Sequence, residues 1–261
     1  MEPFVALMRR YVVDYTSRHD TSVCPEIMAP DYTLRMGSHV LDSRDDKYIP
    51  AASIQFRQYP GLCLTVHEIV TNGAHLAMRF SEHGVAQEKG VAASWRGIGL
   101  YRWDGRHLRE NHVEQDYLTR RRQLREEIPV QAVDTPAVAP WDTTAAPPNP
   151  AAESIVRDWI HAGLPGKEVV VDDQSEGPHL DNTTNTIDLM FSCGDHVAFR
   201  LRREGIYRGG LSEIESAHAG TPATLHAVAM VKIADGAVRA GHMVTDRLGL
   251  VRAVGEAATA S

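Results

Sequence analysis

Residues 97–116, GIGLYRWDGRHLRENHVEQD, decide the fold of this chain. We interpret them as two long strands joined at Asp104-Gly105, because Asp-Gly supplies the φ > 0 residues that tight hairpin turns need. Side chains alternate between the two faces of a strand, so polar residues at every second position share one face. In the last strand this polar row is Glu110, His112, Glu114 and Asp116.

A second copy of the pattern lies at residues 227–246, AVAMVKIADGAVRAGHMVTD. It repeats a strand, an Asp-Gly turn and a strand that ends in His242-x-x-x-Asp246. Residues 74–80 and 195–201 form a matching pair of strands upstream. A repeat of roughly 130 residues has the length of one domain rather than of a solenoid unit. The sequence therefore predicts a tandem duplication.

The first domain is predicted at residues 1–125. Apolar residues at helical spacing predict a helix over 3–19, and further helical stretches are expected at 22–28 and 47–58. One strand is expected between these helices, at 31–36. Four more strands are expected after the last helix, at 62–71, 74–82, 91–103 and 106–118. Helices followed by an antiparallel sheet indicate an α+β domain with a concave pocket between the layers.

A Pro-rich linker is predicted at residues 126–150, which hold six of the 14 prolines. We expect Trp141 in this linker to dock against a domain. The second domain, residues 151–261, is predicted to begin with a helix at 151–162, followed by a strand at 169–171, a polar loop at 172–184 and a strand at 185–193. This interval is shorter than in the first half, so a shortened helical lid is expected.

Composition excludes several classes of protein. The chain is 43% hydrophobic without a long apolar run, which excludes a membrane span, and its net charge of −7 argues against nucleic acid as the main partner. The three cysteines and the histidines lack metal-ligand spacing, so no metal and no cofactor is expected. The N-terminal residues lack the apolar region of a signal peptide, and we expect a cytoplasmic protein.

This arrangement resembles the cone-shaped fold of nuclear transport factor 2, and more specifically the SnoaL-like polyketide cyclases. In the first half the matching residues are Tyr59-Pro60-Gly61-Leu62, Glu110-x-His112-x-x-x-Asp116 and Arg122-Gln123-Leu124. In the second half they are Gly194-Asp195-His196-Val197-Ala198, Arg208-Gly209-Gly210 and Asp246-Arg-Leu-Gly-Leu250. The resemblance implies two tandem α+β cones, each a curved antiparallel sheet with N-terminal helices. It also implies pairing of the open sheet faces, as an intramolecular pseudo-dimer with or without a further homodimer.

The resemblance implies a cofactor-independent cyclase or isomerase of a small hydrophobic, polyketide-like molecule in bacterial secondary metabolism, such as antibiotic biosynthesis. The family's acid/base aspartate corresponds to Asp116, and its duplicate is Asp246. A carboxylate in an apolar cone has a raised pKa and serves as a base or acid near neutral pH. Glu114 and His112 are expected to assist at other depths of the pocket.

Further binding residues are expected around these carboxylates. Tyr11 and Tyr15 offer phenols for an oxyanion or pack in the core, and His242 and Asp246 would bind substrate in the second half. Two other functions stay open: epoxide opening by Asp116 and Glu114, and binding of a small molecule without catalysis. One carboxylate in a dry pocket favours enolisation, two around a water-sized gap favour epoxide opening, and none favours binding alone.

Overall fold

The computed structural model describes residues 1–126, 139–164, 166–175 and 177–259. Residues 127–138 of the predicted linker therefore lie outside the described residues. The elements of the first half are α1 (Pro3–Arg10), η1 (Tyr11–Thr16), η2 (Thr21–Val23), α2 (Cys24–Ile27), β1 (Met28–Met36), β2 (His39–Leu41), η3 (Arg44–Tyr48), α3 (Ile49–Gln58), β3 (Cys63–Thr71), β4 (His75–Val85), β5 (Ala92–Trp103), β6 (Leu108–Gln115) and α4 (Tyr117–Glu126).

The elements of the second half are fewer. They are η4 (Pro140–Asp142), α5 (Pro150–His161), β7 (Val169–Val171), β8 (His179–Cys193), β9 (His196–Gly209), η5 (Ser216–His218), β10 (Pro222–Ala234), β11 (Ala237–Thr245) and α6 (Arg247–Thr259). No helix among the described residues is both long and apolar enough to cross a membrane.

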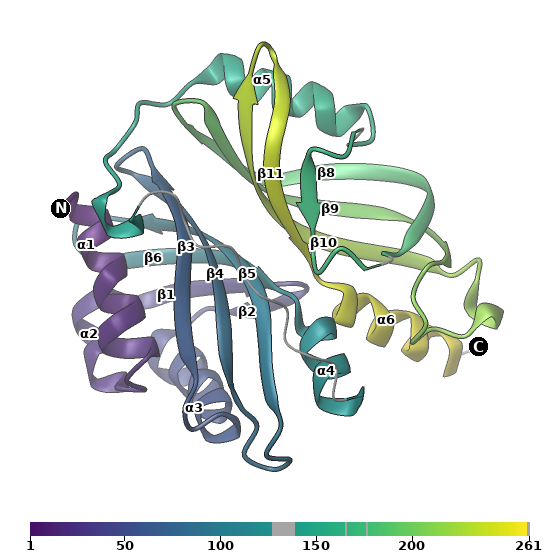
Figure 1. Cartoon of the computed structure of the whole chain (residues 1–261), viewed down its shortest axis with the longest axis horizontal. Helices are drawn as coiled ribbons and strands as arrows, with labels where there is room; N and C mark the ends of the chain where they lie inside the picture. The colour runs from purple at the N-terminus through teal and green to yellow at the C-terminus, as the bar shows by residue number, and fades with distance from the viewer. Residues whose placement is uncertain (127–138, 165, 176, 260–261) are drawn as a thin grey trace.

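The two halves are built on one topology. The first sheet has the strand order β2-β1-β6-β5-β4-β3 and the second has β7-β11-β10-β9-β8. In each sheet a strand that precedes the four antiparallel strands pairs in parallel with the last one, β1 with β6 and β7 with β11. A helix follows each last strand, α4 and α6 (Figure 1). The predicted α+β fold of two curved sheets is confirmed, with β2 added to the first sheet.

The two hairpins pair in the same way around their histidines. Leu100 pairs with His112 as Met230 pairs with His242, and both hairpins shift register near the turn, with one pair beyond the shift in the first hairpin and two in the second. The turns differ, since Asp235 and Gly236 both have positive φ, whereas in the first hairpin only Gly105 does. The strand predicted at 106–118 stops at Gln115, and the polar loop predicted at 172–184 is in part the beginning of β8.

The sheets pack against each other through β5 and β6 of the first half and β10 and β11 of the second (Figure 1). The apolar cluster between them holds Ala77, Ile98, Leu100, Phe191, Cys193, Ala198, Val228, Met230 and Val244. The face of each sheet that points away from its own helices is thus also buried in an apolar core. The burial of large apolar side chains there contributes to holding the halves together.

Helices cover the opposite face of each sheet. In the first half α1, η1 and α3 lie over it, and glycines in β5 leave room for aromatic rings: a Cβ on Gly97 would lie 2.4 Å from the ring of Phe80. In the second half α5 packs Val156 and Ile160 directly onto the sheet. Trp141 is partly buried against the core of the first half, as expected.

Candidate functional site

The predicted polar row of β6 lies on the face of the sheet that points away from the first cone. Asn111, Val113 and Gln115 line the cavity inside the cone. Because strand side chains alternate, the neighbouring residues His112 and Glu114 point toward the second half. The expectation that the row lines the cone pocket is therefore wrong. The alternation was predicted correctly, but the other face is also buried, so polarity alone does not identify the pocket side.

Asp116 and Asp246 are helix caps. The carboxylate of Asp116 accepts hydrogen bonds from the backbone N–H of Thr119 at 3.2 Å and from its hydroxyl at 2.7 Å, at the start of α4. Asp246 accepts the N–H of Gly249 at 2.8 Å at the start of α6. Aspartate at this position satisfies N–H groups that have no partner within the helix. The repeated aspartate thus has a structural role in both halves, and neither residue lines the cone cavity.

Asp116 also belongs to a buried charge network between the halves. Arg247, the first residue of α6, lies between the carboxylates of Asp116, Asp172 and Asp173 at 2.7, 3.4 and 3.0 Å. Asp172 in turn accepts hydrogen bonds from the backbone and hydroxyl of Thr245. A buried guanidinium among three carboxylates is compensated in place, and these contacts hold Asp116 within the network between the two halves.

Glu114 faces a carboxylate of the other half. Its side-chain oxygens accept the N–H of Gly37 at 2.9 and 3.1 Å, and Arg200 lies 3.7 Å away. Burial and then the negative charge of Asp246 raise the pKa of Glu114 to about 8. Asp246 lies against Gly37, where a Cβ would be 2.2 Å from its Oδ2. Glu114 therefore interacts electrostatically with Asp246 of the second half.

The two histidines lie in different parts of the interface. His112 lines an open cleft of about 580 Å³ between the halves, together with Arg200 and His226. Burial and the charge of Arg200 lower the pKa of His112. His242 instead borders a small space beside Arg79 and Arg96. His242 and Asp246 thus belong to the joint between the sheets, rather than to a binding pocket inside the second cone.

The cone of the first half encloses a cavity of about 180 Å³. Its wall is mainly aromatic and aliphatic, and its polar side chains come from several elements. The lining residues are Tyr11, Tyr15, Thr16, Leu34, Met36, Leu41, Tyr48, Ala51, Ala52, Gln55, Phe56, Leu64, Phe80, Glu82, Tyr101, Asn111, Val113, Gln115 and Tyr117. Among them Glu82 is the one carboxylate. A cavity of this size holds about one ring, since an apolar cavity of roughly 150 Å³ binds benzene.

Glu82 is a buried acid on an otherwise apolar strand face. It follows Leu76, Met78 and Phe80 on the inner face of β4 and is 6% exposed. Burial raises the pKa of Glu82 to about 7, although hydrogen bonds from Gln55, at 2.6 Å, and from Trp95 act in the opposite direction. The carboxyl therefore exchanges its proton near neutral pH. Sequence reasoning missed it, although its place at the end of an apolar alternating row was a readable signal.

Neutral phenols face the same space. Tyr11 and Tyr15 line the cavity as placed by the sequence, and the hydroxyl of Tyr11 lies 3.0 Å from that of Tyr48. Burial, followed by the neighbouring phenols, raises the pKa of Tyr11 and of Tyr48 well above the ordinary value. Both side chains stay protonated at neutral pH and can donate a hydrogen bond to a developing negative charge.

Two oxygens in the cavity wall have no partner. The hydroxyl of Thr16 and the side-chain oxygen of Asn111 are buried and accept or donate no hydrogen bond within the described part of the chain. Buried polar atoms in native proteins are nearly always satisfied by protein, water or ligand. Water or a polar group of a bound molecule can satisfy these atoms in the cavity. Among the described residues, no cluster of three or more His, Cys, Asp or Glu side chains is placed to hold a metal ion.

Comparison with known proteins returned no matching family model and no matching curated protein. Solved structures do resemble the chain. A candidate SnoaL-like polyketide cyclase from Jannaschia sp. CCS1 is 14% identical and covers 47% of this chain and 91% of its own, with a TM-score of 0.44. A candidate polyketide cyclase from Acidithiobacillus ferrooxidans is 18% identical, with coverages of 47% and 94% and a TM-score of 0.43.

IdmH from Streptomyces antibioticus, also a candidate polyketide cyclase, is 18% identical and covers 48% of this chain and 99% of its own, with a TM-score of 0.42. Each of these proteins is thus similar to about half of the chain. SnoaL-like polyketide cyclases are among the solved structures to which this chain is similar, as the sequence resemblance predicted.

Proposed function

We propose that the first half is a cofactor-independent cyclase or isomerase of a small carbonyl compound, with Glu82 as the residue that transfers the proton. The observation that carries the proposal is a single carboxylate, with a pKa of about 7, in an aromatic cavity that contains protonated phenols. A general base works best when its pKa lies near the working pH.

In this reaction the carboxylate of Glu82 removes a proton from the carbon next to a carbonyl, and the C–H electrons form an enolate. Tyr11 or Tyr48 donates a hydrogen bond to the enolate oxygen. In a cyclase the enolate carbon then attacks a second carbonyl of the same molecule, which forms a carbon–carbon bond. The protonated Glu82 returns its proton to the resulting alkoxide, so no proton is gained or lost.

The composition of the cavity favours this function over the two alternatives. Epoxide opening needs a second carboxylate around a water-sized gap, and Glu82 is the one acid among the residues that line the cavity. Binding without catalysis needs no acid, and an idle buried carboxyl is costly. The polyketide-like nature of the substrate is part of the proposal, and the reacting end must be about one ring in size to enter.

Proton exchange tests the proposal without knowledge of the substrate. Cyclohexanone is incubated with the protein in D₂O, and loss of the protons next to the carbonyl is followed by NMR. The wild type should accelerate the loss, and Glu82→Gln should reduce the acceleration by about 10²-fold or more, the usual contribution of a general base. Glu215→Gln changes an exposed acid of the second half that does not line the cavity; it is the control and should match the wild type. No difference between the two variants would refute the role of Glu82.

A further inference from the structure

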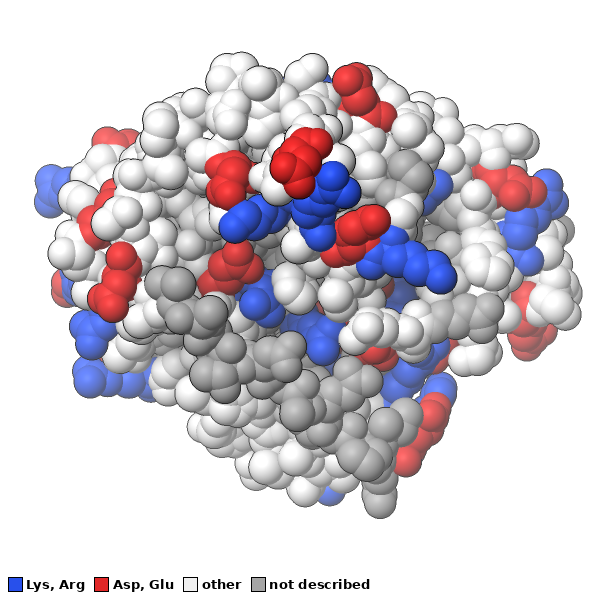
Figure 2. All heavy atoms as spheres, turned by 45° about the horizontal axis from the view of Figure 1, so that its top comes forward, with Lys and Arg blue, Asp and Glu red and all other residues white. Residues whose placement is uncertain are grey.

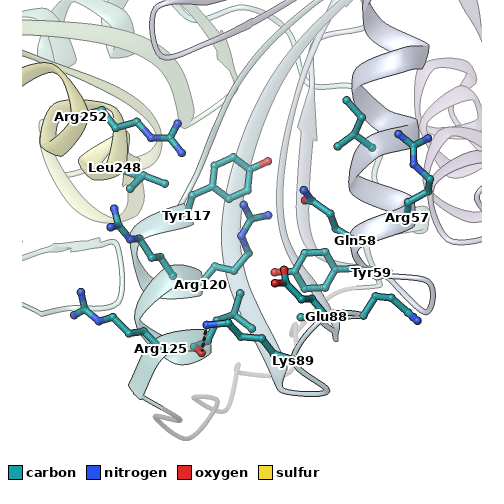
Figure 3. Close-up of a pocket in the computed structure, with 15 residues that line it drawn as sticks. Arg57, Gln58, Tyr59, Glu88, Lys89, Tyr117, Arg120, Arg125, Leu248 and Arg252 are labelled. Atoms are coloured by element: carbon teal, nitrogen blue, oxygen red, sulfur yellow. Dashed lines mark hydrogen bonds between the residues drawn. The ribbon is translucent and has the colours of Figure 1, made fainter. Parts of the chain in front are cut away.

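A cleft larger than the cone cavity, and separate from the open cleft between the two halves, lies beside that cavity. It has a volume of about 760 Å³, within the range of small-molecule sites, and is bounded by α3, the turn between β4 and β5, α4 and α6. Figure 3 shows Arg57 on one side of it and Arg252 on the other, with Tyr117 and Arg120 between them. Tyr117 lines both the cleft and the cone cavity, so its ring forms part of the wall that they share.

The cleft concentrates positive charge in an acidic protein. Its lining holds six basic side chains, Arg57, Lys89, Arg120, Arg121, Arg125 and Arg252, and one acidic side chain, Glu88. The chain as a whole has 27 basic and 34 acidic residues, and on the face drawn in Figure 2 the two kinds lie interspersed. Like charges gathered in one concave site repel one another and attract anions.

Several of these cations lack a carboxylate partner. Within the described residues Arg57, Arg121 and Arg252 are exposed and form no ion pair, and Lys89 donates to the backbone oxygen of Leu124 at 3.3 Å. Their charge is therefore available to a ligand. Arg125, in contrast, pairs with Glu126, and Glu213, which does not line the cleft, pairs with Arg122 at 2.7 Å.

Arg120 is held by aromatic rings rather than by an acid. Its guanidinium carbon lies 4.0 Å from the ring centre of Tyr117, 4.9 Å from that of Trp95 and 5.6 Å from that of Tyr59. Cation–π contacts with three rings hold the guanidinium in place, and within the described residues its N–H groups have no acidic partner, so they can bind oxygen anions. The site therefore combines a guanidinium held by aromatic rings with exposed cations around it.

We propose that this cleft binds the anionic part of a small, flat organic molecule that carries two or more carboxylate or phosphate groups. The volume fits a small molecule, and the net negative charge of the protein disfavours a long polyanion such as nucleic acid. When the ligand is the substrate of the proposed reaction, its uncharged end passes Tyr117 into the cone cavity. That last step rests on the proposed function, whereas binding in the cleft does not.

Calorimetry with two probes tests the site. Benzene-1,3,5-tricarboxylate supplies a flat ring with carboxylates, and inorganic pyrophosphate supplies phosphate without a ring. The variant Arg121→Gln/Arg252→Gln should bind the tighter probe at least about tenfold more weakly, a change worth about 1.4 kcal/mol. The control Arg9→Gln/Arg106→Gln removes the same charge from exposed positions outside the cleft and should bind as the wild type does.

The outcomes separate the sources of the anion and the two proposals. Tighter binding of the tricarboxylate indicates a polycarboxylate ligand, and tighter binding of pyrophosphate indicates a phosphorylated one. Absence of binding by both probes, or equal weakening in both double variants, overturns the inference. Glu82→Gln should bind the probes at least as tightly as the wild type, so failure of the proposed function would leave this result unaffected.

Discussion

Arg247 and Asp116 join the two halves of the chain: Nη2 of the guanidinium lies 2.7 and 2.8 Å from the two carboxylate oxygens. Both side chains are buried, and each stands at the start of the helix that follows the last strand of its sheet. The contact therefore fixes α4 and α6 relative to each other. It also gives Asp116 a structural role at the interface in addition to its role as a helix cap.

Asp116→Asn should destabilise the protein because it leaves the buried charge of Arg247 with one carboxylate fewer. The free energy of unfolding should fall by roughly 3 kcal/mol, the lower end for a broken buried ion pair, because Asp172 and Asp173 remain. Denaturation in urea at pH 7 measures the change.

Asp246→Asn is the matched control for this experiment. Asparagine caps a helix as well as aspartate does, and the substitution removes a negative charge beside Glu114. Its effect on the free energy of unfolding should be less than about 1 kcal/mol. Equal losses in the two variants would contradict the different roles assigned to the two caps.

Glu82 should make the fold less stable as the pH rises. Its pKa is about 7 in the folded state, against about 4.3 in an unfolded chain, so between these values the folded state holds a proton that the unfolded state has released. Raising the pH through this window should cost roughly 3 kcal/mol, which Glu82→Gln should remove. Urea denaturation of both proteins at pH 4.5 and pH 8 measures this loss of stability. If the loss were the same in the wild type and in Glu82→Gln, the raised pKa of Glu82 would be excluded. Glu114 adds a slope of the same sign in both proteins.

Proton exchange of cyclohexanone should follow the ionisation of Glu82, so the rate should rise with pH around a midpoint of about 7. His112→Asn should leave both rate and midpoint unchanged, because the imidazole lies in the cleft between the halves and not in the cone cavity. A loss of rate in this variant, with the fold intact, would indicate that the active site includes the polar row of β6 and would contradict its placement in the cone cavity.

Anion binding in the cleft should raise the pKa of Glu82. The positive charge of Arg120 lowers this pKa, and an anion that neutralises Arg120 removes that effect. NMR titration of Glu82 with and without benzene-1,3,5-tricarboxylate measures the shift. Arg120→Gln should raise the pKa in the absence of the anion and reduce any further response, whereas an identical response to the anion in this variant would mean that the cleft and cavity are not linked through Arg120.

The repeated hairpin predicted the duplication and the equivalent positions of His112 and His242, because strand spacing and turn residues leave direct marks in a sequence. The face of the sheet that holds the site could not be predicted in the same way. A cone sheet packed against a second sheet buries both faces, so Glu114 and Asp116 are as hidden as a catalytic pair would be. Only the contacts of Asp116 with Thr119 and Arg247 distinguish a cap from a base.

The helices α4 and α6 were missed for a related reason. Helix α4 has few apolar residues at helical spacing. The resemblance assigns Asp116 an acid/base role, which hides its other possible role as the cap that begins a helix. Glu82 could have been found as the acid that ends the row Leu76, Met78 and Phe80. The proposed role of Glu82 also depends on the phenols that line the same cavity. These come from helices distant in the sequence and meet only in the folded chain.

The residue that follows the capping aspartate differs between the two halves. Tyr117 and Arg247 are equivalent in the duplication, and each lies near the capping aspartate of the other half. Tyr117 lines the cavity, so the first copy could not place a guanidinium there without losing a wall of its site. In the second half α5 packs onto the concave face of the sheet, and no cavity wall is needed at the position of Arg247. Equivalent positions thus differ in role: Tyr117 forms part of the wall of a cavity, and Arg247 forms the ion pairs that connect the two sheets.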